Sequence, residues 1–230
     1  MLTAIAAGLA SLQLTIRELR AEDIPRAASL LSDAFAPPGG YNLLQQRILQ
    51  KETEAGLTAR LGESLTLVAE QQDALVGSVE VFTPAFLEGK DTRFWNASLP
   101  LESYISALAV DPAYRQQGVA TALMEEVEQR AWDAGEGFVS LQVDATNKAA
   151  ASLYLLELGY EVVGKDNAVS SPSNNPLVAN LLLGGARQRE LLVLQKARPA
   201  AEATPAAVAA AAEDGFARIA RWLRTRLKMS

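Results

Sequence analysis

The stretch Tyr104-Ile-Ser-Ala-Leu-Ala-Val-Asp-Pro-Ala-Tyr-Arg-Gln-Gln-Gly-Val-Ala120 decides the fold of this chain. Its first part, up to Val110, is an apolar run typical of a buried strand. Asp111-Pro112 then ends the strand and starts a turn. The segment after Arg115 leads at once into a helical pattern, so the stretch predicts a strand, a short loop and a helix in direct succession.

The predicted helix start is suited to binding phosphate. Amide groups at a helix N-terminus lack intrahelical partners and lie at the positive end of the helix dipole. Gly118 and Ala120 allow the backbone to approach a ligand closely, and Arg115 adds a positive charge. The segment therefore predicts a phosphate site, with an ordinary turn before an amphipathic helix as the alternative.

A second half of the pattern follows downstream. Phe138–Asp144 has the character of a short buried strand, and Asn147–Tyr160 that of a helix with an N-terminal Asn and a stop at Gly159. Another strand begins at Glu161. With these residues at this spacing, the stretch from Leu14 to Lys196 resembles the GNAT family of N-acetyltransferases, which transfer acetyl from acetyl-CoA to an amine.

The resemblance implies an α/β (α+β) fold with a mixed central sheet of six to seven strands, flanked by helices, whose splayed central strands bind acetyl-CoA. It places the acetyl carbonyl and the pantetheine arm against the backbone of Leu108, Ala109 and Val110. Asn147 corresponds to a residue that hydrogen-bonds the cofactor arm, or is simply a helix N-cap. The pyrophosphate maps onto Arg115, Gln116, Gln117, Gly118, Val119 and Ala120.

Two tyrosines are the catalytic candidates that the resemblance implies. Tyr154 corresponds to the family tyrosine that protonates the CoA thiolate, and a phenol with a pKa near 10 carries its proton at neutral pH. Packing of its ring on the sheet is the alternative role. The strand starting at Tyr104 is similar to that of protein N-terminal acetyltransferases, in which this tyrosine assists amine deprotonation through ordered water.

The general base is left open by the sequence. Gln142 stands where some of those enzymes carry a histidine, and an amide cannot act as a base. Water-mediated deprotonation through Tyr104 or a carboxylate remains. Glu80 and Glu102 are candidates by position, and a solvated acidic residue is the alternative for each.

Composition narrows the chemistry further. The 230 residues include no cysteine and no histidine, which excludes disulfides, a thiolate nucleophile, a Ser-His-Asp triad and metal sites with these ligands. The proposed transfer requires no metal. Net charge is −6, and the last sixteen residues carry five basic and no acidic side chains, which leaves −11 on the rest. This acidity argues against nucleic-acid binding and favours basic acceptors, or it simply confers solubility.

Hydrophobic periodicity and the residues that start or stop helices and strands predict the remaining elements. The expected elements are a strand at 14–19, helices from Asp23 to Phe35 and from 42 to 61, a hairpin of Leu65–Glu70 with Ala74–Phe82, a helix over 119–134, and a last strand at 189–195. Two long connections, Thr83–Glu102 and Lys165–Arg187, interrupt the pattern. Connections that cap the groove favour a small acceptor, and connections that leave a trench favour a peptide.

The chain divides into an N-terminal extension (1–13), an acetyltransferase domain (14–197) and a C-terminal segment (198–230) with an Ala-rich linker and a basic amphipathic helix. That helix binds a membrane surface or a partner, or docks on its own domain. No apolar run is long enough to span a bilayer, and the N-terminus is a poor secretory signal. We expect an intracellular, cytoplasmic protein, with a plastid as the alternative; the oligomeric state is not indicated.

The sequence thus predicts an acetyl-CoA-dependent N-acetyltransferase that acts on a protein or peptide amine, either an N-terminal α-amine or a lysine ε-amine. The alternatives are a small-molecule amine acetyltransferase and a non-catalytic acyl-CoA-binding regulatory protein.

Overall fold

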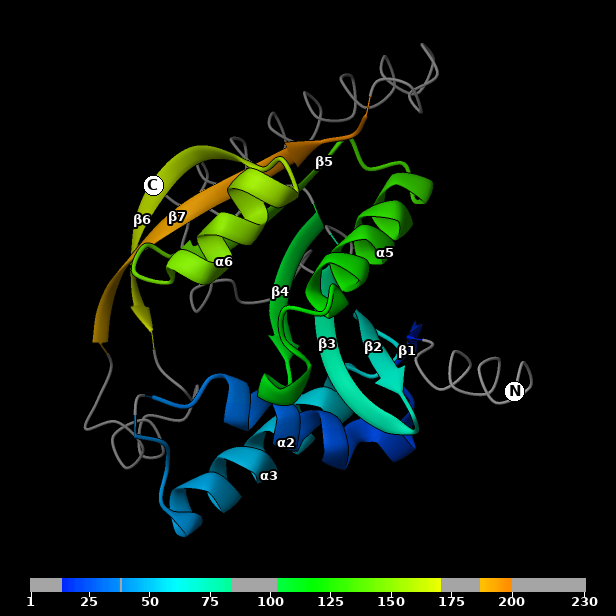
Figure 1. Cartoon of the computed structure of the whole chain (residues 1–230), viewed down its shortest axis with the longest axis vertical. Helices are drawn as coiled ribbons and strands as arrows, with labels where there is room; N and C mark the ends of the chain where they lie inside the picture. The colour runs from blue at the N-terminus through cyan, green and yellow to red at the C-terminus, as the bar shows by residue number, and fades with distance from the viewer. Residues whose placement is uncertain (1–13, 38, 84–102, 171–186, 200–230) are drawn as a thin grey trace, which may run out of the picture. The chain divides into compact units, whose positions relative to one another are not determined.

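The computed structural model describes residues 14–37, 39–83, 103–170 and 187–199 (Figure 1). Seven strands form one mixed sheet in the order β1-β2-β3-β4-β5-β7-β6. The strands are β1 (Thr15–Glu18), β2 (Leu65–Gln71), β3 (Ala74–Phe82), β4 (Ser103–Val110), β5 (Phe138–Asp144), β6 (Glu161–Ser170) and β7 (Arg187–Ala197). The helices are α2 (Ile24–Ala34), α3 (Leu43–Arg60), α5 (Val119–Asp133) and α6 (Lys148–Ser152). Among the described residues, no helix combines the length and hydropathy needed to cross a membrane.

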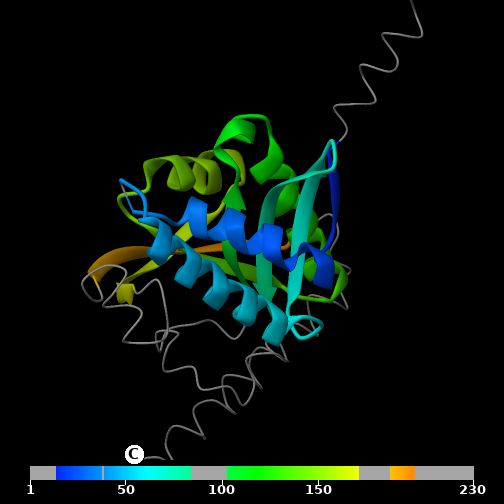
Figure 2. The ribbon, with the colours of Figure 1, turned by 90° about the horizontal axis from the view of Figure 1, so that it is seen from below.

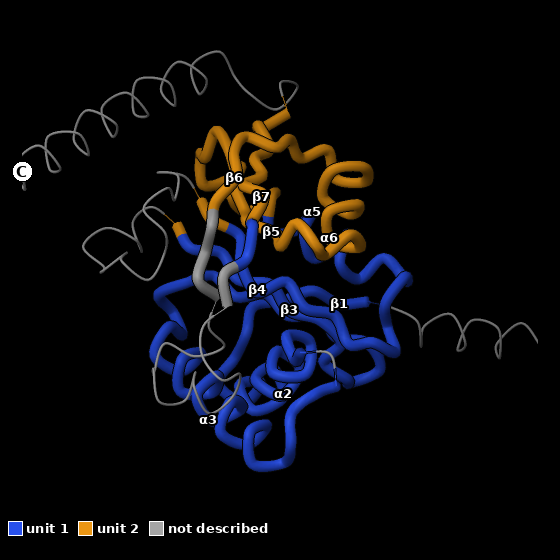
Figure 3. The backbone as a smooth tube through the Cα atoms, turned by 90° about the vertical axis from the view of Figure 1, so that its left-hand side faces the viewer, with its two compact units in different colours: residues 1–82, 105–127, 167–190 blue, residues 83–104, 128–166, 191–230 orange. Residues whose placement is uncertain are grey.

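The chain forms two compact units, which are coloured separately in Figure 3. Unit 1 contains residues 1–82, 105–127 and 167–190, and unit 2 contains the rest. The boundaries run through β4, α5, β6 and β7, so each unit takes part of these elements.

Unit 1 begins with the predicted strand, helix pair and hairpin. Asn42 caps α3, because its side chain accepts a hydrogen bond from the Gln45 amide while the Gln45 side chain accepts one from the Asn42 amide. Gln72 and Asp73 turn the hairpin with positive φ angles of 52° and 62°. A two-residue turn of this kind matches the twist of the strands that it joins. β2 and β3 pair antiparallel from Leu65–Val81 to Gln71–Ala74, with one register shift between Ala69 and Glu70.

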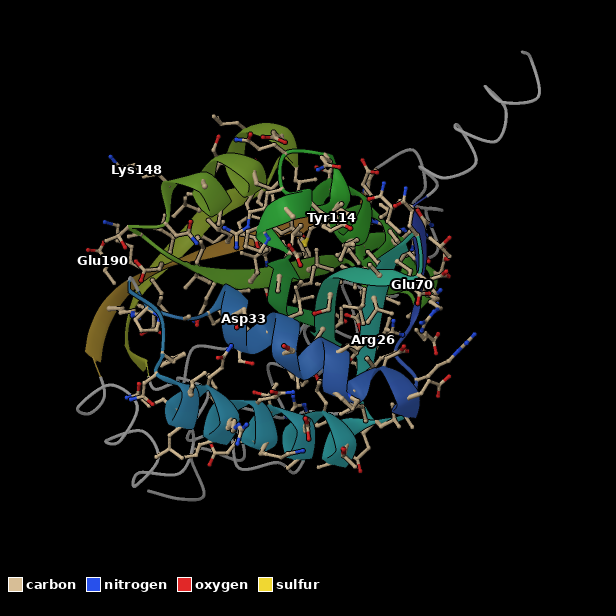
Figure 4. All side chains as sticks on the ribbon, turned by 60° about the horizontal axis from the view of Figure 1, so that its bottom comes forward. Arg26, Asp33, Glu70, Tyr114, Lys148 and Glu190 are labelled. Carbon is tan, nitrogen blue, oxygen red and sulfur yellow. The ribbon has the colours of Figure 1, made fainter. Side chains whose placement is uncertain are left out.

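Asp23 departs from its predicted role. It occupies the N-cap position of α2, but its carboxylate makes no cap hydrogen bond. Instead, the fully buried carboxylate accepts two hydrogen bonds from Arg17 of β1, at 2.6 and 2.9 Å, and one from Arg26 at 2.9 Å. Arg17 also donates to Glu70 of β2. Figure 4 labels Arg26 and Glu70, which lie 3.6 Å apart at their charged groups. The network ties the first strand to the first helix.

Helices pack on both faces of the unit 1 sheet. α2 and α3 lie side by side (Figure 2), and α2 packs its buried face against a cluster that includes Val68 and Ala109. Val68 pairs with Ser78 in the register of the hairpin, so the next residue along β3, Gly77, faces the other way. On that opposite face Gly77 lies against Val119 and Leu123 of α5. The predicted core residues of α5 (Leu123, Met124, Val127 and, in unit 2, Ala131) are all buried.

Unit 2 holds β5, the α6 segment, and most of β6 and β7. β5 covers the predicted residues and pairs antiparallel with β7, with Leu141 opposite Leu194 and Gln142 opposite Val193. α6 is shorter than the predicted helix, because the chain passes into a π-helical turn at Leu153–Glu157. Gly159 then ends the segment with a φ of +73°, a value that glycine adopts without strain.

One predicted connection is partly wrong. Lys165–Arg187 was expected to be a loop, but β6 continues to Ser170, and β7 begins at Arg187. Pairing within the sheet thus overrides the polar composition of this segment, which by itself favours a loop. The N-terminal extension, residues 171–186, most of the Thr83–Glu102 connection and the C-terminal helix lie outside the described residues, as does Glu102.

Candidate active site

The predicted phosphate loop is a set of turns that ends in the first residue of α5. The Asp111 carboxylate accepts a hydrogen bond from the Ala113 amide and fixes the turn after β4. Nε of the exposed Arg115 donates to the Val110 carbonyl at 3.1 Å, which holds this side chain beside the end of β4. The first helical hydrogen bond there runs from the Ala122 amide to the Gly118 carbonyl. Before this first helical hydrogen bond lie the amides of Val119, Ala120 and Thr121. Amides at this position in a helix have no helical partner and can bind an anion.

Gly118 is required by its backbone conformation. Its φ is +81°, and a Cβ added there would meet nothing within 4 Å. The structure shows that conformation, not crowding, explains the glycine, and its contact with a phosphate stays a prediction. Gln116 in the same loop also has a positive φ, of 59°.

Replacing Gly118 by alanine is expected to weaken acetyl-CoA binding about fivefold, because an L-residue in this conformation is strained by roughly 1 kcal/mol. Isothermal titration calorimetry measures the change in Kd. Gly135→Ala is the matched control, since its φ is +89° and its surroundings are equally open. Both variants should lose similar stability, and equal affinities in the two would contradict the assignment of the loop.

Gly77 is a site residue that the sequence reasoning missed. A Cβ at this position would lie 2.9 Å from Leu123 Cδ1, 3.0 Å from Val119 Cγ1 and 3.2 Å from the Ala109 carbonyl oxygen. The glycine thus allows the first turns of α5 to approach β3 and β4 closely. Its signal in the sequence is faint: one glycine inside the apolar run of β3.

Gly77→Ala is expected to displace the start of α5 and to destabilise the fold by about 1–3 kcal/mol, as overpacked sites do. Because α5 begins with the phosphate-binding amides, acetyl-CoA affinity should fall as well. Gly164→Ala is the control, because a Cβ in that strand would meet Val193 at the ordinary distance of 3.9 Å. Unchanged affinity in the Gly77 variant would show that the position of α5 tolerates the extra methyl group.

The central strand is irregular at Ala107. This residue has a φ of +53° inside β4, a conformation that is uncommon for a residue with a side chain and that marks functional sites. Leu108 and Val110 are half-buried and Ala109 is buried. The irregularity lies directly before the three residues whose backbone is predicted to hold the acetyl group. The splay of the central strands itself stays a prediction.

Tyr154 lies in the π-helical turn of unit 2. The wider turn closes with a hydrogen bond from the Leu158 amide to the Leu153 carbonyl, and the Tyr160 amide donates to the Tyr154 carbonyl. Such turns occur frequently at functional sites. The side chain is buried, and this burial raises the pKa of Tyr154 to about 12. Tyr154 therefore keeps its proton throughout the physiological range.

Tyr160 packs behind Tyr154. The two rings meet edge to face with centroids 5.8 Å apart. On its other side, Tyr160 lies 5.7 Å from the ammonium of Lys196, which is ion-paired with the buried Glu128. The Tyr160 hydroxyl forms no well-aligned hydrogen bond, although burial and the nearby Glu128 carboxylate both raise its pKa. These contacts restrict the position of the Tyr154 ring.

Tyr104 and Tyr154 belong to the same unit and lie within electrostatic range of each other. Burial raises the pKa of Tyr104 above its ordinary value, and the negative forms of Tyr154 and Asp166 raise it further, although a hydrogen bond with the backbone of Gln142 opposes this. Tyr104 is thus a phenol at neutral pH, so it can orient a water molecule but cannot itself be the base. Gln142 Nε2 donates to Asp166 Oδ2 at 3.4 Å.

Comparison with known proteins decides the family. The chain matches the acetyltransferase (GNAT) family over residues 27–160, more than half of its length. The chain belongs to this GNAT acetyltransferase family. It is therefore an acetyl-CoA-dependent N-acetyltransferase. No curated protein matches it in sequence.

Solved structures of other acetyltransferases share the fold of this GNAT protein. The ribosomal-protein-S18-alanine N-acetyltransferase from Escherichia coli is 20% identical, with a TM-score of 0.54 over 80% of this chain and 94% of that one. The ribosomal-protein-alanine N-acetyltransferase from Brucella melitensis is 19% identical, with a TM-score of 0.55 over 80% and 99%. PaiA N-acetyltransferase from Thermoplasma acidophilum, solved with coenzyme A, is 15% identical, with a TM-score of 0.53 over 81% and 100%.

Two further candidate site residues of the acetyltransferase, Asn147 and Glu80, form hydrogen bonds within the fold. The Asn147 side chain caps α6 by accepting a hydrogen bond from the Ala150 amide at 3.2 Å, so its predicted contact with the cofactor would use the amide nitrogen. Glu80 is buried, and its oxygens accept hydrogen bonds from Arg60 and Ser64 at 2.7–3.2 Å. Because Arg60 already neutralises this carboxylate, Glu80 holds α3 to the hairpin and is poorly suited to be a base.

The sequence reasoning also missed Ala107 and Asp166. A positive φ at alanine has no signature in a single sequence, and Asp166 lay in a stretch that was predicted to be a loop. Within the described part of the chain, no three acidic side chains gather as a metal site would require.

Proposed function

We propose that this acetyltransferase acetylates a protein or peptide amine, an N-terminal α-amine or a lysine ε-amine, by direct attack in a ternary complex with acetyl-CoA. The observation that carries the proposal is the pair of buried phenols in unit 2. Burial keeps Tyr154 protonated, and the resemblance of the Tyr104 strand to that of protein N-terminal acetyltransferases supports a role for Tyr104 at the acceptor.

The residues of unit 1 fit the binding of acetyl-CoA. The free amides at the start of α5, together with Arg115, supply donors and positive charge for a pyrophosphate. Gly118 keeps the loop open to a ligand. The backbone of Leu108, Ala109 and Val110, next to the irregular Ala107, supplies donors and acceptors for the pantetheine arm and the thioester carbonyl.

The transfer needs one proton donor and one proton acceptor. The amine nitrogen bonds to the thioester carbonyl carbon, the carbon–sulfur bond breaks, and the departing sulfur receives the phenolic proton of Tyr154. The amine gives up its proton to a water molecule that the phenol of Tyr104 orients. The tertiary contacts of Tyr154 with Tyr160 keep the acid in place during this exchange.

Two observations support a macromolecular acceptor. The protein is acidic apart from its basic C-terminal end, so it attracts basic segments of other proteins. Two of the structurally similar proteins are named as ribosomal-protein-alanine N-acetyltransferases. We place the reaction in the cytoplasm, because acetyl-CoA and nascent or folded proteins meet there.

Mass-spectrometric profiling tests the proposal. The pure protein and acetyl-CoA are incubated with a peptide library that contains free α-amines and internal lysines, and the modified atoms are located by fragmentation. Acetylated peptides support the proposal and separate α- from ε-amine use. Release of CoA with polyamines, amino acids or arylamines and not with peptides would instead indicate a small-molecule enzyme. Binding of acetyl-CoA without any turnover would indicate a regulatory protein.

A further inference from the structure

We propose that the carboxylate of Asp166 is the base of the reaction: it accepts the proton of the acceptor amine through one water molecule, and Gln142 positions it. This inference rests on the function proposed above and supplies the acceptor of the proton, which the phenols cannot take up. Asp166 lies on β6 in unit 2, together with Tyr104, Gln142 and Tyr154.

The sheet brings Gln142 and Asp166 together across an intervening strand. Gln142 of β5 pairs with Val193 of β7, and Gly164 of β6 lies beside the same Val193. Because Gly164 has no side chain, the side-chain amide of Gln142 can reach past Val193 and Gly164. It donates to Oδ2 of Asp166, which lies two residues farther along β6. The hydrogen bond uses Oδ2 and orients the carboxylate, while Oδ1 is left to accept a proton.

Tyr104 completes the group from β4. Its phenol hydrogen-bonds with the backbone of Gln142, and it lies close enough to Asp166 for the carboxylate charge to act on it. The Tyr104 hydroxyl and the Asp166 carboxylate thus lie within electrostatic range of each other in unit 2. Asp166 is half-buried, so water can reach its carboxylate, whereas Tyr104 keeps its proton at neutral pH.

Among the described residues of unit 2, the charged groups near Asp166 do not compete for this role. Asp144, on the same face of β5, already accepts two hydrogen bonds at Oδ1 from the amide and hydroxyl of Thr146. Lys165 precedes Asp166 in the strand, so its side chain points to the opposite face. On β7, Leu191 and Val193 are uncharged.

Groups of unit 2 and the solvent account for every proton in the reaction. Asp166 takes one proton, through the water, from the acceptor ammonium and releases it to solvent, which leaves a neutral amine. When the amine attacks, its nitrogen loses a second proton directly to solvent, and Tyr154 gives its proton to the sulfur. The Tyr154 phenolate then regains a proton from solvent, so both residues return to their initial states.

The test is the pH dependence of Asp166→Asn with a peptide that has one free α-amine. We expect kcat/KM to fall roughly 30-fold at pH 7, below the usual range for direct acid–base catalysis because a water intervenes. Above about pH 9 the α-amine, with a pKa near 8, is already neutral. The deficit should then shrink to about threefold or less. A deficit of the same size at all pH values, or no deficit, would overturn the inference.

Controls separate catalysis from folding. Asp144→Asn removes a carboxylate from the same face, and any loss that it causes should not depend on pH. Asp166→Glu keeps a carboxylate and should restore most of the activity that the asparagine variant loses. Thermal unfolding of all three variants reports on stability directly.

Failure of the inference and failure of the proposed function give different results. If Tyr154→Phe loses turnover but Asp166→Asn does not, the acid stands and the base assignment is wrong. If the peptide is not acetylated but another amine is, the same pH series with that amine decides the role of Asp166. If no amine yields CoA, the proposed function and the inference both fall.

Discussion

Replacing Tyr154 by phenylalanine is expected to lower kcat by about 100-fold or more and to leave the Kd for acetyl-CoA unchanged. A positioned general acid contributes about 10²–10⁴ in rate, and phenylalanine keeps the ring that packs edge to face on Tyr160. The variant therefore loses the hydroxyl that protonates the departing thiolate, but it keeps the shape of the site. Release of CoA measures kcat, and calorimetry measures Kd.

The pH profile adds a second readout for this acid. Because burial raises the pKa of Tyr154 to about 12, the wild-type enzyme should show no loss of kcat from this group between pH 7 and 10. Tyr160→Phe is the matched control: it removes a neighbouring buried hydroxyl that has no well-aligned hydrogen bond. Its kcat should stay within about twofold of wild type. Full turnover in Tyr154→Phe would remove the acid from the mechanism.

Replacing Asp23 by alanine is expected to lower the free energy of unfolding by about 3–5 kcal/mol, the range for breaking a buried ion pair on one side. The variant leaves Arg17 without its two hydrogen bonds, and the Arg20 amide loses its acceptor as well. Urea denaturation measures the change. Glu22→Ala is the control, because that side chain is mostly exposed and lies 3.9 Å from Arg20; it should change stability by less than about 0.5 kcal/mol.

The same carboxylate should control acid stability. The Arg17 guanidinium holds the pKa of Asp23 well below its ordinary value near 3.8, against the opposing effect of burial. A lowered folded-state pKa stabilises the fold above the unfolded-state pKa, and this contribution is lost as pH falls through the folded value. The stability difference between wild type and Asp23→Ala should therefore be constant at pH 5–7 and shrink below about pH 4. A difference that does not change with pH would contradict this.

Much of the fold could be predicted because it depends on local signals. The hairpin of β2 and β3, the cap of α6, and the whole of β5 follow from periodicity and turn chemistry. The buried face of α5 follows from its helical spacing. The turn at Gly118 before α5 is also a local feature, and its role in binding phosphate stays a prediction.

The missed features depend on contacts that the local pattern does not show. Asp23 has the sequence of an N-cap, but its carboxylate hydrogen-bonds with Arg17 of β1 and with Arg26. Gly77 is explained only by α5, more than forty residues later. β6 extends into a polar stretch because β7 supplies its hydrogen-bonding partner.

The sequence by itself determined the family, the acetyl-CoA chemistry, and the absence of any histidine or cysteine from the reaction, because composition and short motifs carry this information. The tertiary structure decided the surroundings of the residues that we propose to move protons. Burial keeps Tyr104 and Tyr154 protonated, an ion pair with Arg60 occupies Glu80, and the pairing of β5, β7 and β6 brings Asp166 to Gln142. Proton affinity depends on solvation and neighbouring charge, and both are set by residues that are distant in sequence.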